Sequence, residues 1–203
     1  TEEDQKIFNE YIKNGYLIFD IKDLNRLNLL KKKTVNFIKK NLKSKYQKNY
    51  SDDQFLNNSH KIIEMKNLNN LRLKLINYLN SDKNFKFNYY HFSKHYLEKI
   101  VGNEIAMQQK INLSIQFPND SSSLLPFHSD TWAGDSPFET VVWLPLVDCE
   151  KTKSMYIVPP NKMRLVNSLI KKKMTTDQLF KKLKSSIRWI KIKYGQILIF
   201  NQN

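Results

Sequence analysis

Hydrophobic residues recur at helical spacing through the first half of the chain. Apolar positions within residues 2–13 fall on one face of a helix, and Gly15 is placed to end that helix. Asp23 can cap a second helix, because short side chains that accept hydrogen bonds are favoured there. The apolar run over 16–21 is typical of a short strand. Helical patterns cover residues 2–13, 27–42, 68–79 and 85–100.

The second half of the chain changes to strand patterns. Apolar and polar residues alternate from Ile111 to Phe117, and this period of two indicates a strand with one apolar face. Helical stretches over 161–172 and 176–185 interrupt a series of further strands. Those strands are predicted over 138–147, 155–158, 187–192 and 197–200. A helical half followed by many short strands predicts an α+β fold of jelly-roll type with helical support.

One domain is expected over residues 1–203, with 1–103 as helical support and 104–203 as the jelly-roll core. The strand that ends at Phe200 would leave an exposed sheet edge, which proteins usually cover. The last strand or strands of the roll are therefore expected to be missing, and the chain is expected to be part of a longer polypeptide.

Composition narrows the class of protein. Hydrophobic residues make up 40% of the chain and aromatic residues 12%, which argues against disorder. No apolar run approaches the length of about 18 residues that a membrane span needs. The acidic start, from Thr1 to Asp4, is unlike a secretory signal. The lone cysteine, Cys149, fits a reducing compartment, so a cytoplasmic location is expected.

The formal net charge of +15, from 34 basic and 19 acidic residues, has three interpretations. A basic surface can bind nucleic acid or another anionic partner. A chain rich in Lys, Asn and Ile can also reflect codon bias, with lysines as solvated helix faces. No RNA-binding aromatic signature or zinc-finger spacing accompanies the lysines, so no specific nucleic-acid partner is expected. A field that favours anionic substrates, such as sugar phosphates or nucleotide sugars, is the third interpretation.

The strongest candidate chemistry is His128-Ser129-Asp130. An imidazole and a carboxylate two residues apart at a strand end project to the same side, and can supply two ligands of a 2-His-1-carboxylate iron(II) site. The alternative is a buried structural histidine beside an unrelated acid. The third ligand, a second histidine, is expected soon after the strand at 195–200, where only Asn201, Gln202 and Asn203 follow.

Other residues have both a functional and a structural interpretation. The polar positions Asn112, Ser114 and Gln116 share one strand face, which either meets water or binds a cosubstrate inside the roll. Lys153 can pair with the distal carboxylate of a dicarboxylic cosubstrate, although a lysine there by chance is the simpler interpretation.

The loop after the candidate ligands offers a substrate site. Trp132 can stack on a sugar ring and Asp135 can accept from hydroxyls, or the loop is a plain connection in which Asp135 caps its own turn. Trp143, on the strand that follows, is assigned to the same substrate site. Cys149 has no histidine placed to activate it, and His91 and His95 fit the surface of a helix.

The runs 126–139, 142–148, 154–159 and 194–203 resemble the phytanoyl-CoA dioxygenase-like branch of the iron(II)/2-oxoglutarate oxygenases. The resemblance is closest to bacterial oxygenases encoded among carbohydrate-biosynthesis genes. It covers about residues 105 to 203, and its most specific part surrounds His128. It implies a double-stranded β-helix, iron(II), 2-oxoglutarate and molecular oxygen, with His128 and Asp130 as the first two ligands. The distal histidine and the arginine that grips 2-oxoglutarate in the family have no counterpart before residue 203.

Three functions follow from these observations. The first is an oxygenase that oxidises a C–H bond of a sugar or sugar-derived metabolite and decarboxylates 2-oxoglutarate to succinate. The second is a non-catalytic carbohydrate-binding jelly roll, which the missing histidine would favour. The third is a basic nucleic-acid-binding domain, whose affinity would fall steeply with salt. The sequence makes no prediction of the oligomeric state.

Overall fold

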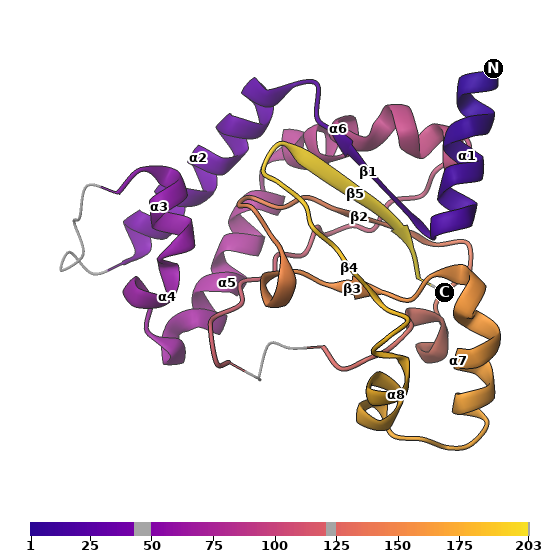
Figure 1. Cartoon of the computed structure of the whole chain (residues 1–203). Helices are drawn as coiled ribbons and strands as arrows, with labels where there is room; N and C mark the ends of the chain where they lie inside the picture. The colour runs from indigo at the N-terminus through magenta and orange to yellow at the C-terminus, as the bar shows by residue number, and fades with distance from the viewer. Residues whose placement is uncertain (43–49, 121–124, 203) are drawn as a thin grey trace. The chain divides into compact units, whose positions relative to one another are not determined.

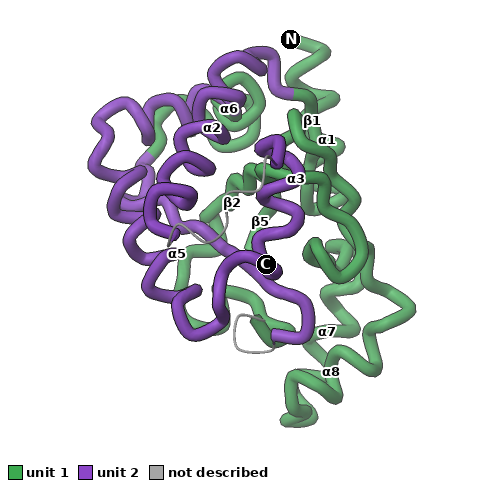
Figure 2. The backbone as a smooth tube through the Cα atoms, turned by 90° about the vertical axis from the view of Figure 1, so that its left-hand side faces the viewer, with its two compact units in different colours: residues 1–20, 93–105, 125–203 green, residues 21–92, 106–124 purple. Residues whose placement is uncertain are grey.

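The structure, a computed structural model, describes residues 1–42, 50–120 and 125–202 (Figure 1). The chain forms two compact units (Figure 2). Unit 1 comprises residues 1–20, 93–105 and 125–203, and unit 2 comprises residues 21–92 and 106–124. One of the boundaries between the units, between residues 92 and 93, falls inside helix α6 (Lys83–Val101).

Unit 1 begins with helix α1 (Glu2–Asn14), which leads directly into strand β1 (Tyr16–Asp20). Thr1 and Asp4 form a capping box at its start. The helix ends at Gly15, whose φ of 78° lies in the left-handed region and whose N–H donates to the Tyr11 carbonyl at 2.7 Å. A Cβ atom at this position would also lie only 3.1 Å from Pro160 Cγ. Glycine therefore fits both the left-handed backbone and the close approach of Pro160.

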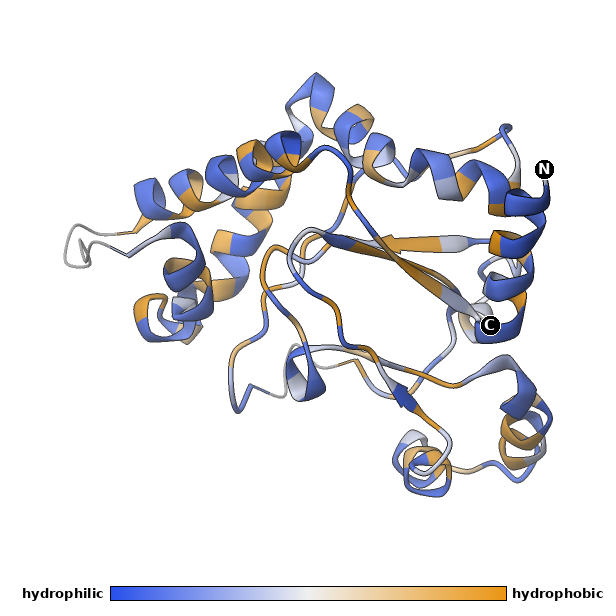
Figure 3. Ribbon diagram, turned by 45° about the horizontal axis from the view of Figure 1, so that its top comes forward, coloured by the Kyte–Doolittle hydropathy of each residue, from blue (hydrophilic) through white to orange (hydrophobic). Residues whose placement is uncertain are grey.

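The main sheet of unit 1 has three antiparallel strands in the order β1-β5-β2 (Figure 1). Strand β5 (Gln196–Asn201) lies in the centre, with β1 on one edge and β2 (Thr140–Trp143) on the other. Its middle residues, Ile197, Leu198 and Ile199, are fully buried. Figure 3 shows this sheet as mainly hydrophobic, as expected of a strand with both faces covered.

A second, two-stranded sheet pairs β3 (Tyr156–Ile157) with β4 (Arg188–Trp189). An isolated bridge between Cys149 and Ile192 lies outside its named strands. Helices α7 (Met163–Ile170) and α8 (Thr176–Leu183) connect β3 to β4 and share a core of their own. Three 3₁₀ helices complete the unit: η2 (Asp130–Ala133), η3 (Lys151–Lys153) and η4 (Pro160–Lys162).

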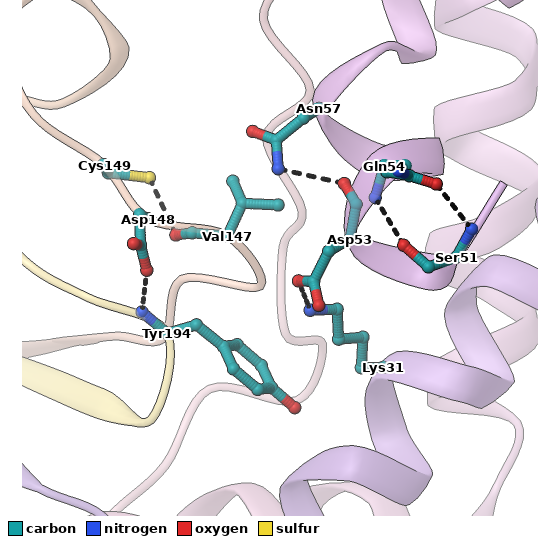
Figure 4. Close-up of polar contacts among 9 residues, drawn as sticks. All are labelled: Lys31, Ser51, Asp53, Gln54, Asn57, Val147, Asp148, Cys149 and Tyr194. Atoms are coloured by element: carbon teal, nitrogen blue, oxygen red, sulfur yellow. Dashed lines mark hydrogen bonds and ion pairs between the residues drawn. The ribbon is translucent and has the colours of Figure 1, made fainter.

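Unit 2 is helical. Its elements are α2 (Leu24–Asn41), α3 (Asp52–Asn57), α4 (Ser59–Ile62), α5 (Met65–Asn80) and the first part of α6. Val35, Phe55 and Leu75 belong to the buried cluster at its centre. The ammonium group of Lys31 in α2, a side chain only 6% exposed, pairs with Asp53 at the start of α3 (Figure 4). Ser51 caps α3 with a capping box closed by Gln54.

These elements confirm the α+β class and most of the predicted helices, including the caps at Gly15 and Asp23. The strands are shorter than predicted: β2 covers four residues where 138–147 was expected, and β4 covers two where 187–192 was expected. The described residues form the two small sheets above, and a jelly roll is not shown. No helix in residues 1–42, 50–120 and 125–202 is both long and apolar enough to cross a bilayer.

The predicted strand over 111–117 is wrong, although its alternation is real. Ile111 and Phe117 are buried in the helical cluster of unit 2, and the intervening polar side chains are exposed. The backbone of Ile111, the first residue of this segment, is hydrogen-bonded to the side chain of Asn80. Ile111 N–H donates to Asn80 Oδ1 at 2.9 Å, and Asn80 Nδ2 donates to the Ile111 carbonyl at 3.0 Å. An amide side chain thus takes the place that a neighbouring strand would hold.

Asn80→Ala should lower the free energy of unfolding by about 2 kcal/mol, because it leaves two part-buried backbone groups of Ile111 without partners. Urea unfolding followed by circular dichroism measures the change. The control is Asn77→Ala in the same helix, an exposed position where a change within about 0.5 kcal/mol is expected. Equal losses in both variants would contradict the anchoring role of Asn80.

Candidate functional site

The imidazole of His128 and the carboxylate of Asp130 lie side by side in a loop of unit 1. His128 Nε2 is 3.4 Å from Asp130 Oδ1. The backbone at Ser129 is extended, with φ −128° and ψ 136°, so the flanking side chains project to the same side. Both side chains are partly open to solvent, at 42% and 38% exposure. The two side chains thus lie on the same side, as their spacing predicted, but in a loop that leads into η2 instead of at a strand end, and their role as metal ligands stays a prediction.

A backbone carbonyl fixes the tautomer of His128. Nδ1 of the ring lies 2.6 Å from the carbonyl oxygen of Pro126. A carbonyl oxygen only accepts, so Nδ1 carries the proton and donates it. Metal-binding histidines are commonly held in this way, with the second nitrogen left free to coordinate.

The remaining ring nitrogen of His128 and the Asp130 carboxylate are then two acceptors that face each other. Such a pair needs either a proton on Nε2 or a shared cation between the two atoms. Two neighbouring ligands, each about 2.1 Å from a metal ion, lie about 3 Å apart, which is close to the separation observed. The pair therefore fits two adjacent positions of a metal ion that prefers nitrogen and oxygen ligands.

Ser129 points away from the pair and ties the loop to the end of β5. Its hydroxyl lies 2.6 Å from the Thr131 hydroxyl and bonds to the backbone carbonyl of Gln202. Gln202 also carries a buried side-chain oxygen, Oε1, with no hydrogen-bond partner among the described residues. A buried acceptor without a partner is costly, so this position suits a donor or a cation supplied by a bound group.

Short-range hydrogen bonds shape the loop that follows the pair. The N–H of Trp132 donates to the Ser129 carbonyl at 3.0 Å, and the N–H of Asp135 donates to the Asp130 carbonyl at 3.3 Å. Gly134, with φ 101°, makes the turn between them. The side chain of Asp135 is exposed and open to an incoming ligand.

Five aromatic rings form a cluster beside the loop, and we call it the aromatic cluster: Phe127, Trp132, Tyr156, Phe180 and Trp189. Phe127 lies 5.8 Å from Trp132 and 6.3 Å from Tyr156, between ring centroids. Tyr156 in turn lies 5.2 Å from both Phe180 and Trp189. The two tryptophans are 44% and 47% exposed, so their rings are accessible to a ligand.

The remaining predicted site residues lie elsewhere. Trp143 is half-buried in β2 and packs against the core around Leu198. Lys153 is exposed in η3, within unit 1. The positions Asn112, Ser114 and Gln116 are exposed and belong to unit 2, whereas His128 belongs to unit 1. Their cosubstrate role stays a prediction.

A third protein ligand of the predicted kind is not found in the part of the chain that the structure describes. No group of three or more His, Cys, Asp or Glu side chains there could hold a metal ion. Sequence reasoning had missed the carbonyl of Pro126, the hydroxyl of Ser129 and the amide of Gln202. The only available signal was the alternation in His-Ser-Asp, which turns the serine away from the two flanking side chains.

Comparison with known proteins returns no relative. No protein-family model matches the chain, and no curated protein or solved structure matches it either. Its function is therefore inferred from its own residues.

The surroundings of Cys149 disfavour the thiolate form that a nucleophile needs. The thiol is buried and donates to the Val147 carbonyl at 3.3 Å (Figure 4). Burial raises the pKa of the Cys149 thiol above its ordinary value, which lowers the fraction of reactive thiolate at neutral pH.

The native protein should therefore react with a thiol reagent such as dithionitrobenzoate much more slowly than the urea-unfolded protein at the same pH. Unfolding removes the burial and restores the ordinary pKa, so the rate should rise on denaturation. Raising the pH should speed the native reaction, since deprotonation is the limiting condition. Equal rates in the native and unfolded protein would contradict a buried, protonated thiol.

Ser129→Ala should lower the free energy of unfolding by about 1 kcal/mol, because it removes the hydroxyl that joins the loop to the carbonyl of Gln202. Ser185→Ala, at an exposed serine beyond α8, is the matched control and should change stability by no more than about 0.5 kcal/mol. Thermal unfolding of both variants measures the difference. A stable Ser129→Ala protein would show that the loop is held by its other contacts.

Proposed function

We propose that this chain carries the catalytic site of an iron(II)/2-oxoglutarate-dependent oxygenase that oxidises a C–H bond of a sugar or sugar-derived metabolite. The observation that supports this most directly is the geometry of His128 and Asp130. Nε2 and Oδ1 are 3.4 Å apart, and Nδ1 is committed to the carbonyl of Pro126. The double-stranded β-helix expected of such enzymes is part of the same proposal, with β1, β5 and β2 as strands of its main sheet.

The donor set fits iron(II). A neutral imidazole nitrogen and a carboxylate oxygen are two of the three ligands in the 2-His-1-carboxylate sites of non-haem oxygenases. The bond between Ser129 and Gln202 brings the end of β5 to the pair, which is where a histidine after this strand would complete the set. The buried Oε1 of Gln202 provides an acceptor for a group bound there.

Iron(II) with 2-oxoglutarate and oxygen supplies oxidation of a C–H bond, coupled to conversion of 2-oxoglutarate to succinate and carbon dioxide. The chain's own residues hold and orient these reactants. The carbonyl of Pro126 accepts from Nδ1 of His128, so Nε2 is the ring nitrogen that faces Asp130, and Ser129 ties the loop to Gln202. Lys153 is proposed to pair with the distal carboxylate of 2-oxoglutarate as a point charge.

The exposed ring of Trp132 suits the apolar face of a sugar, and the exposed carboxylate of Asp135 suits its hydroxyl groups. Trp143 completes the proposed substrate set, although its packing against the sheet core gives it a structural role as well. We also infer a cytoplasmic location, which the single cysteine supports.

A non-catalytic carbohydrate-binding jelly roll is the second candidate. The absence of a three-residue metal group among the described residues favours it, and the exposed tryptophans would serve it equally well. The two candidates differ in their need for metal, so iron content discriminates between them.

In the full-length gene product, His128→Ala and Asp130→Ala should each weaken iron(II) binding and lower succinate formation from 2-oxoglutarate by more than about 100-fold, since each removes a metal ligand. Anaerobic equilibrium dialysis measures iron, and chromatography measures succinate. The matched controls are His91→Ala on the exposed surface of α6 and Glu139→Ala in the loop before β2, and both should behave as the unmutated protein.

Two outcomes would count against the oxygenase. Full succinate formation in His128→Ala or Asp130→Ala would show that the pair does not hold the metal. A full-length protein that binds neutral sugars but binds no iron would identify the non-catalytic alternative.

A further inference from the structure

Positive charge is concentrated in the last quarter of the chain. Residues 151–203 contain thirteen lysines and arginines and a single acidic residue, Asp177, for a net charge of +12. Residues 1–150 contain 21 basic and 18 acidic residues, for a net charge of +3. Codon bias would spread lysines over the whole chain together with their acidic neighbours, so it does not account for this asymmetry.

Most of this charge lies on the segment 161–193, which we call the basic hairpin; it contains α7, α8 and β4 (Figure 1). The apolar faces of its two helices are used inside the protein, where Val166 and Leu169 pack with Leu179 and Leu183. The lysine runs at 171–173 and at 181, 182 and 184 are exposed.

Few of these charges are needed by the fold. Within the basic hairpin, only Lys191 forms an ion pair with a carboxylate of the described residues, Glu150 at 3.4 Å. Crowded like charges repel one another and destabilise the folded state, and an anionic partner would offset that repulsion. The inward apolar residues of α7 and α8 are buried, so the surface that the hairpin shows to solvent is mainly its lysines, together with the exposed side chains of Leu165 and Trp189.

The basic hairpin packs directly against the loop that carries the candidate ligands. Phe127, the residue before His128, packs against the buried core of α7 and α8. Tyr156 links the same ring to Phe180 of α8 and to Trp189 of β4. The buried core of the two helices that carry the lysine runs is therefore joined to the loop of His128.

We propose that the basic hairpin binds the phosphates of an anionic substrate, a sugar joined to a diphosphate, and that the exposed rings of Trp132 and Trp189 receive its sugar and its aromatic or apolar parts. The identification of this ligand as the oxidised substrate rests on the proposed oxygenase function, whereas its binding does not. Lysine ammonium groups bind phosphate as point charges, and tryptophan faces pack on sugar rings, so the two features together match a molecule that has both parts.

Isothermal titration calorimetry without metal tests the inference, with uridine diphosphate glucose as the charged probe and methyl glucoside as the neutral one. The charged probe should bind at least about tenfold more tightly, and its affinity should fall as salt is raised. Two triple variants should each raise its Kd by about tenfold: one with Lys171, Lys172 and Lys173 changed to Gln, and one with Lys181, Lys182 and Lys184 changed to Gln.

A matched control removes the same charge from unit 2, by Lys74→Gln, Lys83→Gln and Lys86→Gln together, at exposed positions of α5 and α6. Its Kd should stay within about twofold of the unmutated value. Circular dichroism confirms that each variant is folded, and competition by pyrophosphate on the unmutated protein gives a second readout that needs no variant.

Equal binding of the charged and neutral probes, or equal losses in the hairpin and control variants, would overturn the inference. A single-stranded oligonucleotide that binds far more tightly than the diphosphate sugar, with a steeper salt dependence, would also overturn it and would identify a nucleic-acid surface instead. These titrations contain no metal, so they do not depend on the oxygenase proposal. If that proposal fails, the unmutated protein would bind no iron in the dialysis experiment but would still bind the diphosphate sugar.

Discussion

The burial of strand β5 between two antiparallel neighbours is the interaction on which unit 1 depends. Both of its edges are hydrogen-bonded, one to β1 from the beginning of the chain and one to β2 from its middle. The free energy of this arrangement comes from apolar burial, since Ile197, Leu198 and Ile199 are removed from water completely. The candidate site depends on the same strand, because Ser129 bonds to the backbone of Gln202 at its end.

Local signals in the sequence predicted most of the helical part. Helix α1 ends at Gly15 and α2 begins at Asp23, because a left-handed turn and a capping carboxylate are properties of single residues. The failure at 111–117 has a different cause. The alternation of Ile111 to Phe117 correctly indicates one buried and one exposed face, but periodicity does not reveal what partners the backbone. Asn80, about thirty positions earlier in the chain, bonds to the backbone where a strand would have been required.

The candidate site likewise has one part that the local sequence predicts and another that depends on long-range packing. Two residues apart on an extended backbone, His128 and Asp130 must share a side, so the sequence alone predicted their approach. The hydrogen bond from Nδ1 to Pro126 is also local, yet it depends on backbone angles that composition does not report. The bond from Ser129 to Gln202 joins residues more than seventy positions apart, and its existence depends on the packing of β5. Long-range contacts of this kind determine whether two candidate ligands are held in place for binding, and a single sequence does not reveal them.

Charge in this chain is informative through its position rather than its total. A uniform excess of lysine would be consistent with a solvated surface, and the near balance of residues 1–150 is of that kind. The basic hairpin differs because the apolar faces of its helices pack on one another and on Phe127, while Lys191 is the hairpin residue that pairs with a carboxylate among the described residues. The same packing joins the helices that carry these lysines to Phe127, the residue before His128. A phosphate-bearing ligand would relieve the repulsion among the lysines on binding, whereas a neutral sugar would leave that cost in place.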